Sequence, residues 1–138
     1  MVAWSEDWVT LADLAGVCKF AWYRSRNFPM LIKRGLELVN EILVAVTGLP
    51  LTPQALLRCG ERVYNVEKLF NLREGFGRES DYPPQRFFQE ETPDGPSKGA
   101  KLNLADYDRV LDDYYEARGW DKKTGQPTPR KLRDLGLA

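Results

Sequence analysis

The sequence predicts an all-α fold, a compact irregular bundle of about five helices with one long wrapping loop. Apolar residues recur at intervals of three and four in several stretches, and no stretch alternates apolar and polar residues as a strand would. Residues that favour helix ends, Ser, Thr or Asn before and Gly after, border these stretches. A chain of 138 residues with 43% hydrophobic content suits a single domain, residues 1–138, with a core of its own.

The first helix is expected to begin at Ser5, whose hydroxyl would cap it. Gly16 stands where a left-handed C-cap would end the helix, so Val17 and Cys18 should follow in extended backbone. A connecting loop is expected over residues 22–27. The apolar stripe of this helix is predicted to consist of Trp8, Leu11, Ala15 and Cys18.

The second helix is expected to open with Pro29 and to close at Gly48 and Pro50. Two acidic residues, Glu37 and Glu41, share one of its faces, where we expect them to be solvated rather than catalytic. The apolar repeat that predicts this helix consists of Leu31, Gly35, Leu38, Ile42 and Val46.

The third helix shows the clearest pattern, with Thr52 as its cap, Pro53 as its first residue and an end near Asn71. Cys59 belongs to its stripe and is therefore expected to fill the core. Gly60 costs a helix about 1 kcal/mol relative to alanine, which favours the close approach of another helix there. The stripe consists of Leu56, Cys59, Val63, Val66 and Phe70.

Residues 75–102 are rich in proline and glycine and are predicted to form the long loop. Asn103 should cap a fourth helix that stops at Gly119. A last short helix should open with Thr128 as its cap and Pro129, run through Leu135 and end at Gly136. The aromatic residues expected to hold the loop against the core are Phe76, Tyr82, Phe87 and Phe88.

Composition excludes several classes of function. Twenty basic and twenty acidic residues balance, so we expect neither a nucleic-acid partner nor a membrane partner. No run approaches the roughly 20 apolar residues of a membrane span, and the start lacks the pattern of a secretory signal, so the expected location is the cytoplasm. The chain has no histidine and so lacks the commonest general base, which makes it a poor candidate for a complete enzyme.

The most informative motif combines Asp13, Gly16, Val17 and Cys18, with Lys19 next in the chain. It would place a thiolate, which can bind a metal, and a carboxylate, which can accept hydrogen bonds, within one short turn. The simpler interpretation is that Cys18 is a small buried hydrophobe, as lone cysteines usually are. A four-iron cluster usually takes four thiolates, and this chain has two cysteines.

Together with four other blocks, this motif resembles the C-terminal end of the tungsten-containing aldehyde ferredoxin oxidoreductases. The resemblance runs from about Trp4 to Ala138 and so covers nearly the whole chain. The other blocks, in the order of the chain, are residues 62–76, 83–88, 114–121 and 132–137.

The resemblance implies an enzyme that oxidises aldehydes to carboxylic acids with ferredoxin as electron acceptor. It also implies a tungsten or molybdenum ion held by two pterins beside a 4Fe-4S cluster. Cys18 matches the fourth cluster ligand of the family, and Asp13 matches a carboxylate that binds a pterin. Val17 replaces the usual leucine, and Lys19 completes the expected cofactor-binding set.

The family's three-cysteine segment, its other pterin-binding motif and its active-site histidine and glutamate have no counterpart in this chain. The implied partners are therefore the remaining cluster- and pterin-binding domains and ferredoxin, and we expect the chain alone to be inactive and to bind no cofactor. An excised domain, a truncated product and a separate subunit all stay open. The alternative function is a non-catalytic helical protein-interaction module, and the tryptophans near the motif could face either the core or a partner.

Overall fold

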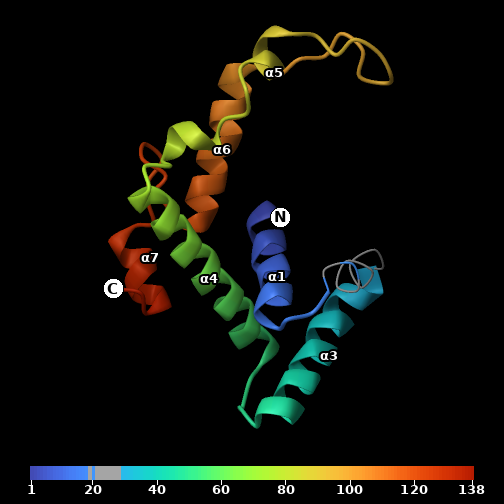
Figure 1. The fold of residues 1–138 in the computed structure, drawn as a ribbon, viewed down its shortest axis with the longest axis vertical. Coiled ribbons are helices and arrows are strands. Elements are labelled where there is room, and N and C mark those ends of the chain that lie inside the picture. Colours follow the sequence, from blue (N-terminus) through green and yellow to red (C-terminus); the bar gives the residue numbers. More distant parts are fainter. Residues whose placement is uncertain (19, 21–28) are drawn as a thin grey trace. The chain divides into compact units, whose positions relative to one another are not determined.

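The computed structural model describes residues 1–18, 20 and 29–138, and Figure 1 shows how their helices follow one another. No strand occurs in these residues, which confirms the all-α class. Five helices of seven residues or more occur there, as predicted, and none of the helices in this part of the chain is long and apolar enough to cross a membrane. Their bounds are α1 (Val2–Leu14), α3 (Pro29–Thr47), α4 (Pro53–Arg73), α6 (Leu104–Arg118) and α7 (Pro129–Leu135).

The chain divides into two compact units, and the boundary between them falls within α4. The first unit consists of residues 1–67 with Leu137, and the second of residues 68–136 with Ala138. The organisation as a single domain stays a prediction. The expected connecting loop at residues 22–27 and the candidate residue Lys19 lie outside the described residues.

The core of the first unit lies where α1 meets α3 and α4. Its fully buried residues come from α1 and α4, with exposed fractions of 4% or less, and α3 packs against them through partly buried side chains. Cys59 is one of the partly buried residues that pack against this core, so its predicted place is confirmed. The buried residues are Trp8, Leu11, Ala12 and Leu56, and α3 contributes Leu36, Val39 and Leu43.

Helix α1 begins earlier than the sequence predicted. Its N-cap is Met1, and Ser5 lies inside the helix with its backbone N–H donating to the Met1 carbonyl. The prediction that Ser5 caps the helix is therefore wrong. The earlier start places Trp4 one turn before Trp8, and the two rings stack with their centroids 6.1 Å apart. This contact extends the helix because it adds a turn that packs on the buried Trp8.

The predicted stripe of α1 also needs one correction. Cys18 is exposed and does not continue the stripe, because the helix has already ended at Leu14. The simpler interpretation of Cys18 as a buried hydrophobe is therefore wrong. Ala12, which the predicted stripe omitted, is fully buried instead.

Helix α4 confirms its predicted ends, and the Thr52 hydroxyl accepts a hydrogen bond from the backbone N–H of Ala55 at 3.1 Å. The close approach predicted at Gly60 is also confirmed, because a Cβ atom there would lie 2.2 Å from the carbonyl oxygen of Asp7 in α1. Two members of the predicted stripe, Val66 and Phe70, are about half exposed, at 47% and 54%. The last turns of α4 thus bury residues outside the predicted stripe. One of them is Lys68, whose contacts are described with the second unit.

The second unit contains the long loop, in which a 3-10 turn η1 (Arg78–Asp81) and a short helix α5 (Arg86–Gln89) form. The predicted caps are confirmed: the Asn103 side chain accepts from the Asp106 N–H and the Thr128 side chain from the Lys131 N–H. Tyr82 and Phe88 hold the loop by contacts with Tyr107, but Phe76 and Phe87 are more than half exposed, so half of the predicted aromatic anchors are wrong. The buried apolar residues of this unit are Leu111, Tyr115, Trp120 and Leu135.

Candidate functional site

The motif at the end of α1 folds into a Schellman cap. Gly16 adopts the left-handed conformation, with φ at +64°, after Ala15 closes the helix. The Val17 N–H donates to the Ala12 carbonyl at 3.0 Å, and the Gly16 N–H donates to the Asp13 carbonyl at 3.2 Å. Counted from Ala12 as the first residue of the motif, these hydrogen bonds run from the sixth residue to the first and from the fifth to the second. They satisfy the last carbonyls of the helix and require a positive φ at Gly16, which favours glycine. The predicted left-handed cap at Gly16 is confirmed.

The cap leaves the three described candidate residues at one exposed helix end. Asp13 lies roughly 140° around the helix axis from the buried Trp8, at 3.6 residues per turn, and is exposed. Val17 is 42% exposed, and Cys18 lies outside the helix, as predicted, but is exposed. A Cβ atom built at Gly16 would meet no atom of the described residues within 4 Å, so that part of the chain leaves the space beside the turn open. A large group can therefore approach the backbone between the carboxylate and the thiol.

The donor set at this turn suits part of a cofactor site rather than a whole one. The described residues contain no group of three or more His, Cys, Asp or Glu side chains that could hold a metal ion. Cys18 and Cys59 form no disulfide with each other, and Cys59 packs against the core of the first unit. A thiolate at Cys18 is a soft ligand suited to iron–sulfur clusters, and the carboxylate of Asp13 can accept N–H donors. The turn thus fits one cluster ligand and one acceptor for a ring with N–H groups.

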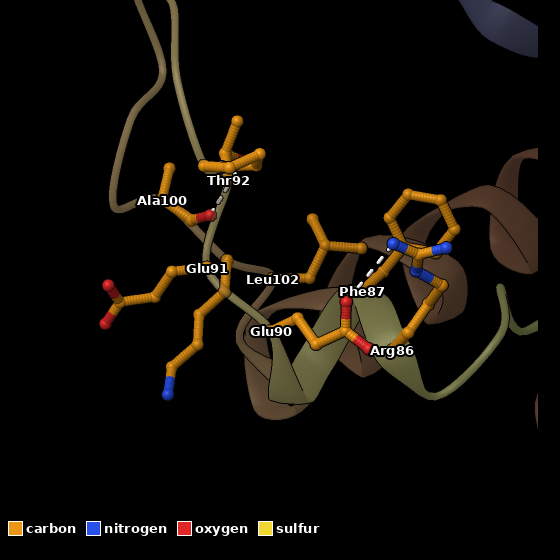
Figure 2. A pocket seen from close by; sticks show the side chains of 9 residues that line it. Arg86, Phe87, Glu90, Glu91, Thr92, Ala100 and Leu102 are labelled. Carbon is orange, nitrogen blue, oxygen red and sulfur yellow. Dashed lines mark hydrogen bonds and ion pairs between the residues drawn. The ribbon is translucent and has the colours of Figure 1, made fainter.

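The second unit contains an open pocket of about 680 Å³ between α5 and the rest of the loop, shown in Figure 2. Arg86 and Glu90 form an ion pair at 3.1 Å on one side of it. The backbone N–H and the hydroxyl of Thr92 both donate to the Ala100 carbonyl at 2.9 Å and close the base of the loop. None of the described motif residues lines this pocket. Its lining consists of Arg86, Phe87, Glu90, Glu91, Thr92, Pro93, Ala100, Lys101 and Leu102.

The sequence did not predict a polar network in the second unit. Lys68, only 8% exposed, forms an ion pair at 2.8 Å with Asp81, which also accepts the Tyr115 hydroxyl. Burial, together with the hydrogen bond to Asp81, raises the pKa of Tyr115. A helical spacing of four from Leu111 to Tyr115 was the available signal for the buried tyrosine. Its carboxylate partner lies 34 residues away in the sequence and carries no such signal.

Nearby, Arg78 joins η1 to α6 through two carboxylates, Asp108 at 3.3 Å and Asp112 at 2.7 Å. Tyr82 also donates to Asp108, and this hydrogen bond is the first cause of the raised pKa of Tyr82. Arg78 and Tyr82 thus both have carboxylate partners on α6. The network therefore stabilises the second unit by joining η1 to α6.

Comparisons with known proteins agree with the family resemblance. The family model described as aldehyde ferredoxin oxidoreductase, domains 2 and 3, matches residues 1–137. The tungsten-containing aldehyde ferredoxin oxidoreductase of Pyrococcus furiosus is 35% identical over 134 residues, 96% of this chain, and that of Pyrococcus horikoshii is 34% identical over 138 residues, 99% of this chain. The Thermococcus kodakarensis enzyme of the same name is 34% identical over 134 residues. The chain spans about a fifth of the length of these relatives, 20% to 21%. The resemblance inferred from the motifs is thus confirmed, and the chain belongs to the aldehyde ferredoxin oxidoreductase family.

Proposed function

We propose that this chain supplies one iron–sulfur ligand and pterin contacts to a complete aldehyde ferredoxin oxidoreductase. In this proposal Cys18 is the metal ligand, and Asp13, Val17 and Lys19 belong with it to the cofactor-binding set. The complete enzyme would oxidise aldehydes to carboxylic acids and pass the electrons to ferredoxin. The names of the relatives, all tungsten-containing aldehyde ferredoxin oxidoreductases, support the choice of reaction and metal.

The observation that carries the proposal is the Schellman cap at Gly16. It ends α1 so that the carboxylate of Asp13 and the thiol of Cys18 both lie exposed at one turn, away from the buried Trp8. A purely structural turn has no need of an exposed thiol, since cysteine is among the residue types most often buried. Exposure of Cys18 therefore favours a role for its sulfur outside this chain's own core.

Each residue of the turn would have a distinct task. The Cys18 thiolate would bind one iron, and the Asp13 carboxylate would accept hydrogen bonds from pterin N–H groups. Gly16 would keep the approach open, because among the described residues no neighbouring atom outside the turn lies within 4 Å of the place a Cβ would take. When bound, a tungsten–pterin group would supply the oxidation of the aldehyde, and a four-iron cluster would supply electron transfer to ferredoxin.

The other cluster ligands must come from elsewhere in the enzyme. A single thiolate cannot hold four irons, and the described residues offer no cluster of co-ligands. The partner required is therefore the remainder of the oxidoreductase, with its own cluster- and pterin-binding domains. This requirement agrees with the chain's share of about a fifth of its relatives' length.

The proposal is tested by producing the chain alone and together with the polypeptide that carries the remaining domains. Iron and pterin are then measured per mole of protein in both samples. We expect both cofactors in the assembly and neither in the chain alone. Stoichiometric iron in the chain alone would contradict the proposal, and an assembly that forms without either cofactor would favour the non-catalytic interaction module.

A further inference from the structure

Helix α3 presents an apolar ridge on the side that does not pack against the core of the first unit. Three of its side chains follow at intervals of four residues and are 53%, 52% and 78% exposed, and a fourth beyond the helix end is 54% exposed. The adjoining side of the same helix, roughly 90° around its axis, supplies the side chains that pack against the core. We call this surface the α3 ridge; it consists of Leu38, Ile42, Val46 and Leu49.

The spacing of the α3 ridge is that of a helix-packing surface. Side chains at i, i+4 and i+8 form a continuous row, and such a row packs into the groove between two rows on another helix. Single exposed apolar residues are common on soluble proteins, but an aligned row of large ones marks an interaction surface. The α3 ridge therefore has the geometry to receive a helix or groove from another polypeptide segment.

The charges beside the α3 ridge narrow the choice of partner. Glu37 and Glu41 are both exposed, and among the described residues neither forms an ion pair or a hydrogen bond. The two basic residues of this helix, Lys33 and Arg34, precede the α3 ridge, and none occurs from Gly35 to Thr47. If two copies of the α3 ridge packed together, four carboxylates would meet at one interface. The stretch Gly35–Thr47 of either copy would supply no basic side chain to balance them, which is unfavourable. A partner with basic side chains beside an apolar surface would complement both features.

We propose that the α3 ridge docks onto the part of the oxidoreductase that this chain does not contain, on an apolar surface bordered by lysine or arginine. This inference rests on the proposed function, since it takes the remaining domains as the occupant. The chain covers about a fifth of the length of its relatives, so the larger part of such an enzyme is available to cover the ridge. The α3 ridge lies outside the Asp13–Cys18 motif and needs no cofactor for its contact.

The test measures the association of the chain with the polypeptide that carries the remaining domains, by copurification and titration. Ile42→Lys and Val46→Lys each place a charge within the apolar row, and we expect about tenfold weaker association or more from each. Glu41→Lys should also weaken association, most strongly at low ionic strength, because it removes a complementary charge. Val110→Lys is the matched control, since Val110 is a valine on α6 that is 61% exposed and lies outside the ridge; its association should stay at the wild-type value.

Three results would overturn the proposal. Val46→Lys could associate as tightly as the wild type, or the wild-type chain could form a dimer that this substitution dissolves. The third result concerns the melting temperature of the isolated chain. If Val46→Lys lowered it as much as a core substitution does, the chain itself would cover the ridge. Iron content separates this proposal from the proposed function: loss of iron on Cys18→Ser with normal association supports the ligand role whether or not the ridge variants dissociate.

Discussion

The Tyr115 hydroxyl donates a hydrogen bond to Oδ2 of Asp81 across 2.5 Å, and this contact joins α6 to the 3-10 turn η1. Lys68 of α4 donates to the same oxygen at 2.8 Å. Tyr115 is completely buried and Lys68 is 8% exposed, so one carboxylate satisfies two buried donors. The stability of the second unit therefore depends on Asp81 more than on any exposed ion pair.

Asp81→Asn should lower the free energy of unfolding by about 1–3 kcal/mol, because it leaves the buried Lys68 without its counterion. Glu90→Gln is the matched control. Glu90 pairs with Arg86, but both side chains are more than 60% exposed, and such pairs contribute about 0–1 kcal/mol. Denaturant unfolding of both variants measures the difference. Equal losses in the two variants would show that Asp81 has no special role.

The raised pKa of Tyr115 predicts a loss of stability in alkaline solution. Burial is its main cause, and the hydrogen bond to Asp81 adds to it. Up to a pH of about 10, the usual tyrosine pKa, the tyrosine keeps its proton in both folded and unfolded chains, so this contribution is complete there. Above that pH the unfolded chain loses the proton first, and stability falls as pH rises toward the higher folded pKa.

Melting temperatures of the wild type and Tyr115→Phe between pH 9 and about 11 check this expectation. The decline should be smaller in Tyr115→Phe, because that variant has one fewer buried hydroxyl to ionise. A residual decline is expected from Tyr82, whose pKa is also raised, through its hydrogen bond to Asp108. Parallel curves for the two proteins would rule out the contribution of Tyr115.

Gly60→Ala should destabilise the first unit by about 1–3 kcal/mol, although alanine favours helix formation. The added Cβ would lie 2.2 Å from the Asp7 carbonyl oxygen, so α1 and α4 must separate. Gly77→Ala is the control, since its Cβ would come no closer than 3.6 Å to the Thr124 carbonyl oxygen and its backbone has a negative φ. Thermal unfolding compares the two, and a Gly60→Ala protein as stable as the wild type would contradict the close packing of α1 on α4.

The sequence predicted best those features that neighbouring residues determine. The caps at Asn103 and Thr128 and the helix ends at Gly119 and Gly136 depend only on residues within one turn, and all four are confirmed. The start of α1 depends on how Trp4 stacks on Trp8, a side-chain contact that competes with the capping signal of Ser5.

Features set by distant partners could not be predicted. Lys68 is buried because Asp81 and the rings of Tyr115 and Trp120 surround its ammonium group, and their sequence positions carry no shared period. For the candidate site, the motif predicted the left-handed turn at Gly16, but the exposure of Cys18 followed only from the end of the helix at Leu14. The assignment of the cofactor-binding residues stays a prediction.

Asp13→Asn in the complete assembly should lower pterin retention and leave the fold unchanged. The exchange replaces one acceptor oxygen with N–H donors that would face pterin donors, at a cost on the order of 1–3 kcal/mol in binding. Asp13 lies in the last turn of α1, where a negative charge opposes the helix dipole, so the melting temperature of the chain should stay the same or rise slightly. Pterin per mole of protein and thermal unfolding are the two measurements. Unchanged pterin content would contradict the cofactor role of Asp13.

Iron content of the two cysteine variants in the complete assembly tests the central proposal most directly. Cys18 is exposed at the turn and Cys59 packs against the core, so the variants separate a ligand from a structural thiol. We expect Cys18→Ser to lose iron and the visible absorption of the cluster, while Cys59→Ser keeps both and loses only stability. Equal iron in Cys18→Ser and the wild type would contradict the account of Cys18 as the ligand that this chain supplies.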